Sequence, residues 1–247
     1  LMLYESAPVF NPTHLFGLFS VFTPDVISGV NIYQANIPAK YGGRIASVVD
    51  VKVKNPYTDR LKIEGGIGVI SSRFTISTPI VRDKLMLLAG GRIGFTDFLF
   101  PLLIPRLKNT KANFSDSTVK LLYLPNENNQ LTYTHFYSKD FYQLDLISSI
   151  ENIVSSSNQY DFGTSNHTLR WLHGFENNTN LVGTLVHSSY LPKNLFPEID
   201  SSNVIKFKSQ IQYTSAQFEY KDSRNEALDY YLGIQFNQYN INPGSLD

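Results

Sequence analysis

The sequence predicts a mainly β protein, most of which is an antiparallel wall of long strands like that of a transmembrane β-barrel. From Asp59 onward, apolar and polar residues alternate with a period of two in one run after another. Short connectors rich in Asn and Asp alternate with long ones, at roughly 96–116, 138–160 and 189–203. Connectors of two length classes are typical of barrels whose two ends differ. Aromatic residues make up 13% of the chain, which also favours strands.

About nine strands are expected after residue 59. They lie near 60–70, 72–80, 84–95, 117–124, 130–138, 161–172, 180–188, 204–221 and 227–239. The clearest is 228–237, where Leu228, Leu232 and Phe236 share one face, and its length of about ten residues suits a tilted strand that crosses a bilayer. At 205–213, the apolar face carries Ile211 and Tyr213. We expect the apolar stripe of each strand to face lipid and the polar stripe to face the barrel interior.

The first 57 residues follow a different pattern, in which Pro and Gly interrupt short apolar pieces. Thr23 and Pro24 are expected to begin a short helix, with Thr23 as its N-cap. The stretch 28–35 then predicts a short strand. Gly42 and Gly43 are expected to permit a sharp reversal where no side chain fits, before a valine-rich strand that ends at Asn55. This segment is therefore expected to be a small α+β unit.

Composition and motifs argue against several functions. The 21 basic and 21 acidic residues balance, which argues against a nucleic-acid partner. The chain has no cysteine, so disulfides, thiolate metal sites and a cysteine nucleophile are excluded. No apolar run reaches the ~18 residues of a transmembrane helix. The five histidines show no metal-ligand spacing, and no nucleophile elbow or phosphate loop is present. We therefore expect no enzyme, no catalytic residues, no cofactor and no metal site.

One stretch carries a resemblance. Residues 8–55, PVFNPTHLFGLFSVFTPDVISGVNIYQANIPAKYGGRIASVVDVKVKN, resemble the C-terminal half of the plug of TonB-dependent outer-membrane receptors, especially those of Bacteroidetes-type bacteria. The matching residues are Asn11, Pro12, His14 to Gly17, Phe19 to Phe22, Pro24, Asp25, Ile37 to Ala39, Tyr41 to Arg44, Ser47, Val48 and Asp50. Residues 64–95 resemble the first barrel strands, and beyond 110 only the strand rhythm agrees. Glu5-Ser6 replaces the family's usual Asp-Gly pair, which puts that turn in question.

The resemblance implies an architecture and a function. Residues 1–57 would be the C-terminal part of a plug domain, and residues 58–247 the N-terminal part of a 22-stranded transmembrane β-barrel, so we expect the chain to be a fragment. The implied function is energised uptake of a siderophore, vitamin, glycan or peptide through the cell outer membrane. The implied partners are outer-membrane lipid, that substrate, a surface lipoprotein lid, and TonB, which would act through a segment that this sequence lacks.

Several residues are candidates for such a function. Arg44 and Glu64 are expected to form a latch between plug and barrel, although an exposed turn charge would also explain Arg44. Arg73 and Arg92 are expected to line the lumen, where buried ion pairs could also act as latches. Tyr41, Gly42 and Gly43 would form the plug turn. The long connectors offer substrate-contact candidates, which are Phe98, Phe100, Phe141, Tyr142 and Asp145.

Two alternatives stay open from the sequence. The first is a receptor-like barrel subunit of a secretion, motility or adhesion complex that transports nothing itself. The second is a soluble β-rich binding domain, in which the apolar stripes would pack against each other in a dry interior. Alternation of apolar and polar residues does not by itself distinguish these arrangements.

Overall fold

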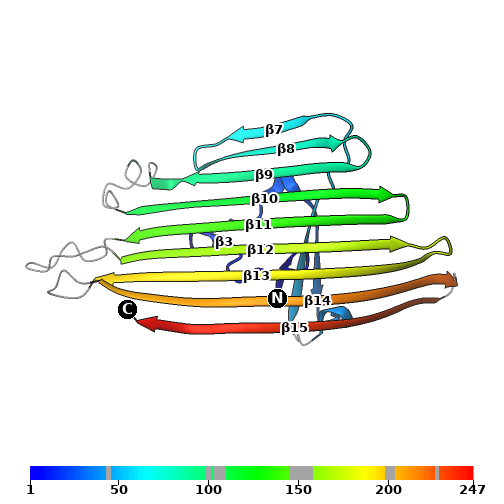
Figure 1. Cartoon of the computed structure of the whole chain (residues 1–247). Coiled ribbons are helices and arrows are strands. Elements are labelled where there is room, and N and C mark those ends of the chain that lie inside the picture. Colours follow the sequence, from blue (N-terminus) through cyan, green and yellow to red (C-terminus); the bar gives the residue numbers. More distant parts are fainter. Residues whose placement is uncertain are drawn as a thin grey trace, which may run out of the picture.

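The computed structural model of the chain describes residues 1–42, 46–97, 102, 110–144, 158–197, 204–225 and 228–246. A nine-stranded antiparallel sheet, which we call the wall, follows the chain order from β7 to β15 without a crossover (Figure 1). This confirms the predicted number of strands and their meander. The strands are β7 (Lys62–Ile67), β8 (Ser71–Val81), β9 (Leu85–Phe95), β10 (Lys111–Asn126), β11 (Asn129–Leu144), β12 (Asn158–Gly174), β13 (Thr179–Pro197), β14 (Val204–Asn225) and β15 (Leu228–Leu246).

Several strands run further into the long connectors than the sequence predicted. β10 begins at Lys111 rather than near 117, β11 ends at Leu144 rather than near 138, and β13 ends at Pro197 rather than near 188. The β10–β11 pairing continues in register from Lys111↔Gln143 to Tyr123↔Leu131. In these extensions polar and apolar side chains share a face, as Phe114 and Asp116 do on the inward side of β10, so the hydrophobic alternation fades although the backbone ladder continues.

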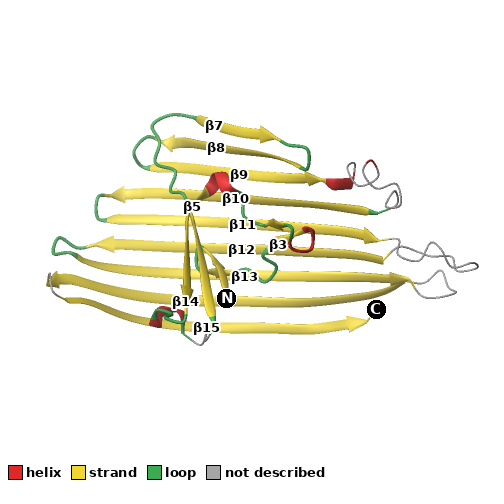
Figure 2. Ribbon diagram, turned by 180° about the vertical axis from the view of Figure 1, so that it is seen from behind, coloured by secondary structure: helices red, strands yellow, loops and turns green. Residues whose placement is uncertain are grey.

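Residues 1–57, which we call the inner segment, pack against one face of the wall (Figure 2). They form a four-stranded sheet in the order β2-β1-β6-β5 and a small two-stranded sheet of β3 and β4. Their strands are β1 (Met2–Tyr4), β2 (Ala7–Pro8), β3 (Thr13–His14), β4 (Phe19–Ser20), β5 (Ile27–Gln34) and β6 (Ser47–Val53), and their 3₁₀ turns are η1 (Leu15–Gly17), η2 (Pro24–Val26) and η3 (Ala39–Tyr41). No helix among the described residues is long and apolar enough to cross a membrane.

The wall therefore has an inward and an outward face. Inward side chains of the wall join the core of the inner segment: Phe136 of β11 lies 4.7 Å from the ring of Tyr4, which explains why an aromatic interrupts the polar stripe of this strand. The outward face of β15 exposes Leu232, Ile234 and Phe236 by more than half of their surface, and no second sheet of the described residues covers them. The predicted orientation of this stripe, away from the interior, is confirmed.

The prediction that the apolar face of residues 205–213 points outward is wrong. Tyr213 is buried with Ala7 of the inner segment and Val186 of β13, so it faces inward. Gln212 and Lys208, which alternate with it, consequently face outward. In this part of β14 the inward side carries the apolar residues, because it continues the surface on which the inner segment packs.

Local expectations for the inner segment have mixed outcomes. The strands predicted at 28–35 and after residue 46 are confirmed as β5 and β6. The helix at Pro24 is a single 3₁₀ turn, and Thr23 does not cap it. Gly42 adopts φ −47° and has room for a Cβ, so glycine is not required there; Gly43 lies outside the described residues. The Glu5-Ser6 turn forms without glycine, at φ 49° and 73°.

Gly90 of β9 offers a test of how closely the inner segment sits on the wall. A Cβ there would lie 2.4 Å from Cγ1 of Val26, so Gly90→Ala should push η2 away and destabilise the protein by about 1–3 kcal/mol. Gly163→Ala on β12 is the matched control, because no atom lies within 4 Å of its Cβ position. Thermal unfolding in detergent measures both, and equal melting temperatures for the two variants would contradict the close approach.

Candidate functional site: the interface between inner segment and wall

β10 provides successive inward side chains that contact the inner segment. Asp116, Thr118 and Lys120 are all buried, and each bonds to a different part of that segment. The hydroxyl of Tyr4 lies 2.7 Å from Oγ1 of Thr118. Lys120 donates to the carbonyl of Val53 at 3.1 Å and pairs with Glu5 at 3.4 Å. The inward stripe of one strand therefore holds much of the interface.

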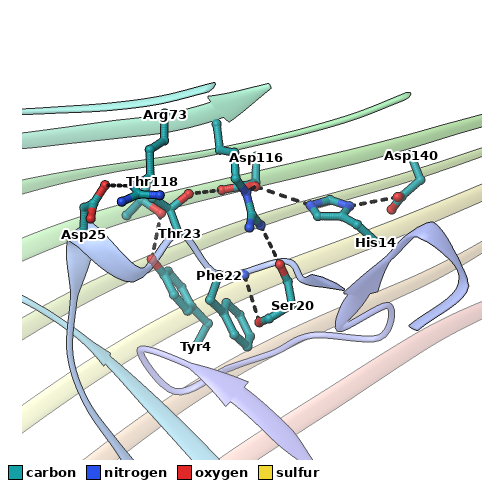
Figure 3. Close-up of polar contacts among 11 residues, drawn as sticks. Tyr4, His14, Ser20, Phe22, Thr23, Asp25, Arg73, Asp116, Thr118 and Asp140 are labelled. Carbon is teal, nitrogen blue, oxygen red and sulfur yellow. Dashed lines mark hydrogen bonds and ion pairs between the residues drawn. The ribbon is translucent and has the colours of Figure 1, made fainter. Parts of the chain in front are cut away.

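The centre of the interface is a buried cluster of charged groups (Figure 3). Oδ2 of Asp116 accepts a hydrogen bond from Nε of Arg92 at 2.7 Å and lies 3.4 Å from Nε2 of His14. Nδ1 of His14 lies 2.8 Å from Oδ1 of Asp140 on β11. Thr23 donates to Oδ1 of Asp116. We call His14, Arg92, Asp116 and Asp140 the ionic cluster; it joins the inner segment to β9, β10 and β11.

His14 is fully buried in this cluster, and two opposing effects set its pKa. Burial lowers the pKa, whereas the hydrogen-bonding and electrostatic effects of Asp116 and Asp140 raise it; the carboxylates prevail, so the pKa of His14 lies above its ordinary value. With His14 protonated, two positive groups balance the two carboxylates. Its ring also stacks on Phe114, with centroids 4.4 Å apart.

Further hydrogen bonds and one ion pair at the border surround the ionic cluster. Asp140 also accepts hydrogen bonds from Asn11 at 3.2 Å and from the hydroxyl of Tyr142 at 2.9 Å. Asn166 and Ser188 of the wall both donate to the carbonyl of Pro8. At the border of the interface, Arg73 pairs with Asp25 at 2.7 Å but is half exposed. Arg73 and Arg92 thus both contact the inner segment, as their position in the polar phase predicted.

The structure places the predicted site residues differently. Arg44 lies outside the described residues, so its pairing with Glu64 stays a prediction; Glu64 itself is exposed on β7. Tyr41 ends η3 and donates to Asp50 at 2.7 Å. Phe98, Phe100 and Asp145 also lie outside the described residues.

Phe141 and Tyr142 belong to β11 and not to a connector, which corrects that expectation. Tyr142 is buried against Phe16, with ring centroids 4.2 Å apart. The ionic cluster itself was not predicted, because Asp116 and Asp140 fell in predicted connectors. Asp116 shares the inward phase of Thr118 and Lys120, and this alternation is a sequence signal that could have placed it inside, although its partners follow only from the register of the strands. Among the described residues, no group of three or more acidic, His or Cys side chains is arranged to hold a metal ion.

Asp116→Asn tests whether the ionic cluster attaches the inner segment. The change leaves the buried Arg92 and His14 without a shared anion, which should weaken the attachment by about 3–5 kcal/mol. Asp25→Asn removes the partner of the half-exposed Arg73 and should cost no more than about 1 kcal/mol. The measurement is the urea concentration at which protease begins to cut residues 1–57 of the full-length protein. Similar midpoints for the two variants would rule out a special role for the cluster.

The pH dependence of the same transition tests the protonation of His14. Because the pKa of His14 is higher in the folded state, its stabilising effect is complete below the ordinary histidine value of ~6.5 and is lost as the pH rises through the raised pKa. The difference in urea midpoint between the wild type and His14→Gln should therefore shrink as the pH increases from 5.5 to 9. A difference that stays constant or grows would show that His14 is attached as the neutral imidazole.

Comparison with known proteins identifies the fold. No family model matches the sequence, and no curated protein matches it either. The ferripyoverdine receptor of the outer membrane of Pseudomonas aeruginosa matches with a TM-score of 0.65 and 14% identity over 96% of this chain and 36% of that receptor. The ferric enterobactin receptor PfeA of the same species gives a TM-score of 0.69, with 12% identity over 98% of this chain and 41% of that one.

The alcaligin outer-membrane receptor FauA of Bordetella pertussis gives a TM-score of 0.51, with 11% identity over 99% of this chain and 50% of that one. The chain thus spans between 36% and 50% of the length of these receptors. At such identities the likeness concerns the fold. The nine-stranded wall and the inner segment therefore have the fold of part of an outer-membrane siderophore receptor, as the resemblance of residues 8–55 predicted.

Proposed function

We propose that this chain is part of a TonB-dependent receptor in the cell outer membrane that takes up a small molecule, glycan or peptide. Residues 1–57 are then the C-terminal part of the plug domain, and residues 58–247 are the first part of the barrel. One observation carries this proposal: the inner segment is attached by buried charges to one face of a wall whose other face exposes large apolar side chains. A wall that is apolar outside and polar inside suits lipid on one side and a plug on the other.

The ionic cluster takes the role of latch in this proposal. Passage of a substrate requires the plug to move relative to the wall, and that movement must separate His14 from Asp116 and Asp140. A buried ion pair is costly to break while it stays dry, because each separated charge loses its partner before it gains water. Once water enters, hydration compensates both charges. The interface therefore favours two states, closed and hydrated, over intermediate ones, and force from TonB would drive the change between them.

Ferric siderophores are the first substrate class to test. The ferripyoverdine and ferric enterobactin receptors bear the names of such ligands, and their fold extends over nearly all of this chain. The connectors expected to contact substrate lie mostly outside the described residues, so their side chains do not select one substrate class. Vitamins, glycans and peptides are therefore tested as well.

Uptake in the native host tests the function. Cells receive a mixture of ferric siderophores, cobalamin, oligosaccharides and peptides, and mass spectrometry follows the loss of each compound from the medium. We expect one class to be consumed by the wild type and spared both by a strain that lacks this protein and by a strain that lacks TonB. Consumption that needs the protein but not TonB would contradict energised uptake, and consumption independent of the protein would contradict transport by it.

A further inference from the structure

Three histidines form a row on the outward face of the wall. His135 of β11 pairs in register with His167 of β12, which pairs with His187 of β13. Their ring centroids are 4.6 Å and 6.5 Å apart along the row. Their sequence neighbours Phe136, Asn166 and Ser188 all contact the inner segment, so the histidines point the other way. Two further residues continue the row in register, Thr214 of β14 and Gln238 of β15.

This row separates an apolar half of the outward face from a half that is mostly polar but also carries Phe141, Leu191 and Leu195. Toward the tight connectors, the outward positions carry Leu131, Leu169, Trp171, Leu185, Phe218, Ile234 and Phe236. Toward the long connectors, the next outward positions carry Tyr137, Ser165, Ser189, Gln212 and Asn240. The change occurs at the same register position on the four adjacent strands from β12 to β15, whereas on β11 a tyrosine lies on each side of the row. In a membrane barrel, such a change marks the limit of the hydrocarbon layer.

The polar half of this face is positively charged. Lys139, Lys193, Lys206 and Lys208 occupy outward positions of β11, β13 and β14 between the row and the long connectors. In the described part of β11–β15, Asp161 is the single carboxylate on that half, and it pairs with Lys139 at 3.3 Å. A surface with this excess of cations attracts the phosphate groups of a lipid leaflet.

A cavity of about 610 Å³ extends from the apolar half up to the histidine row. Leu169, Leu185 and Phe236 line its apolar part, while His187 and Gln238 line its polar part. His187 is exposed, and its Nδ1 lies 3.1 Å from Oγ1 of Thr214. Its Nε2 has no hydrogen-bond partner in the described part of the chain and can bond to a phosphate oxygen. The cavity thus combines a surface for an acyl chain with polar groups for a headgroup.

We propose that the histidine row and this cavity bind a phosphate-bearing membrane lipid, with its headgroup at His167 and His187 and an acyl chain along Leu185 and Phe236. This site rests on the proposed membrane location, because it needs a leaflet boundary at the row. It is distinct from the ionic cluster, which lies on the opposite face of the wall and involves β9, β10 and β11.

Native mass spectrometry of the full-length protein in detergent tests the site. The probes are dimyristoyl phosphatidic acid and dimyristoylglycerol, which has the same chains but lacks the phosphate. The wild type should retain roughly tenfold more phosphatidic acid than the double variant His167→Leu/His187→Leu, because a tenfold change corresponds to about 1.4 kcal/mol, or about 0.7 kcal/mol for each of the two lost hydrogen-bonding groups. His173→Leu is the matched control: it changes an outward-facing histidine of β12 in the apolar half and should bind like the wild type. Thr214→Val is a milder second variant and should show a smaller loss.

The outcomes separate this site from the proposed function. Insertion of each variant in the outer membrane is first verified by its heat-modifiable electrophoretic mobility. If all variants insert and retain equal phosphatidic acid, the lipid site is wrong while the membrane location stands. Equal retention of dimyristoylglycerol and phosphatidic acid by the wild type would remove the role of the phosphate. Displacement of phosphatidic acid by millimolar inorganic phosphate would show a free-anion site and would also overturn the proposal.

Discussion

The fold depends on the neutralisation of two carboxylates that the wall buries on its inward face. Asp116 and Asp140 are almost completely excluded from water, and a charge in such a place is tolerated only with a partner. The wall supplies Arg92, and the inner segment supplies His14, whose pKa these two carboxylates raise in opposition to its burial. Without the inner segment, the two carboxylates of the wall would lose one of their partners, and without the wall, His14 would lose both of its carboxylate partners. The inner segment therefore compensates the interior of the wall as well as filling it.

The Glu5-Ser6 turn shows the same dependence at a second place. Both residues adopt positive φ, a conformation that costs roughly 1–2 kcal/mol for a residue with a Cβ. The Glu5 side chain offsets this cost, because it accepts the amide N–H of Val53 at 2.6 Å and pairs with the buried Lys120. A glycine-containing turn would have no need of this compensation.

The sequence predicted the elements well where one face of a strand is apolar and the other polar. It failed where polar and apolar side chains share one face, so the strand that carries Asp116 was begun too late and the strand that carries Asp140 was ended too early. It also failed at 205–213, where the inward face carries the apolar residues. The ionic cluster was beyond local pattern, because His14 and Asp140 are 126 residues apart and meet only through the register of the strands. His14 is among the residues that carry the resemblance of 8–55, but the resemblance does not indicate which residues His14 contacts.

The way in which the two parts are joined explains how one can move while the other stays intact. The wall is a continuous backbone ladder, but in the described residues no backbone–backbone hydrogen bond joins it to the inner segment. Instead, the wall side chains Arg92, Lys120 and Ser188 donate to inner-segment carbonyls of Ser20, Val53 and Pro8. Separation therefore exchanges side-chain contacts for water and leaves every strand pair of the wall intact. In the proposed function, a rigid frame that holds the inner segment by side chains alone would release it without unfolding, and the buried charge at the centre would oppose a gradual release.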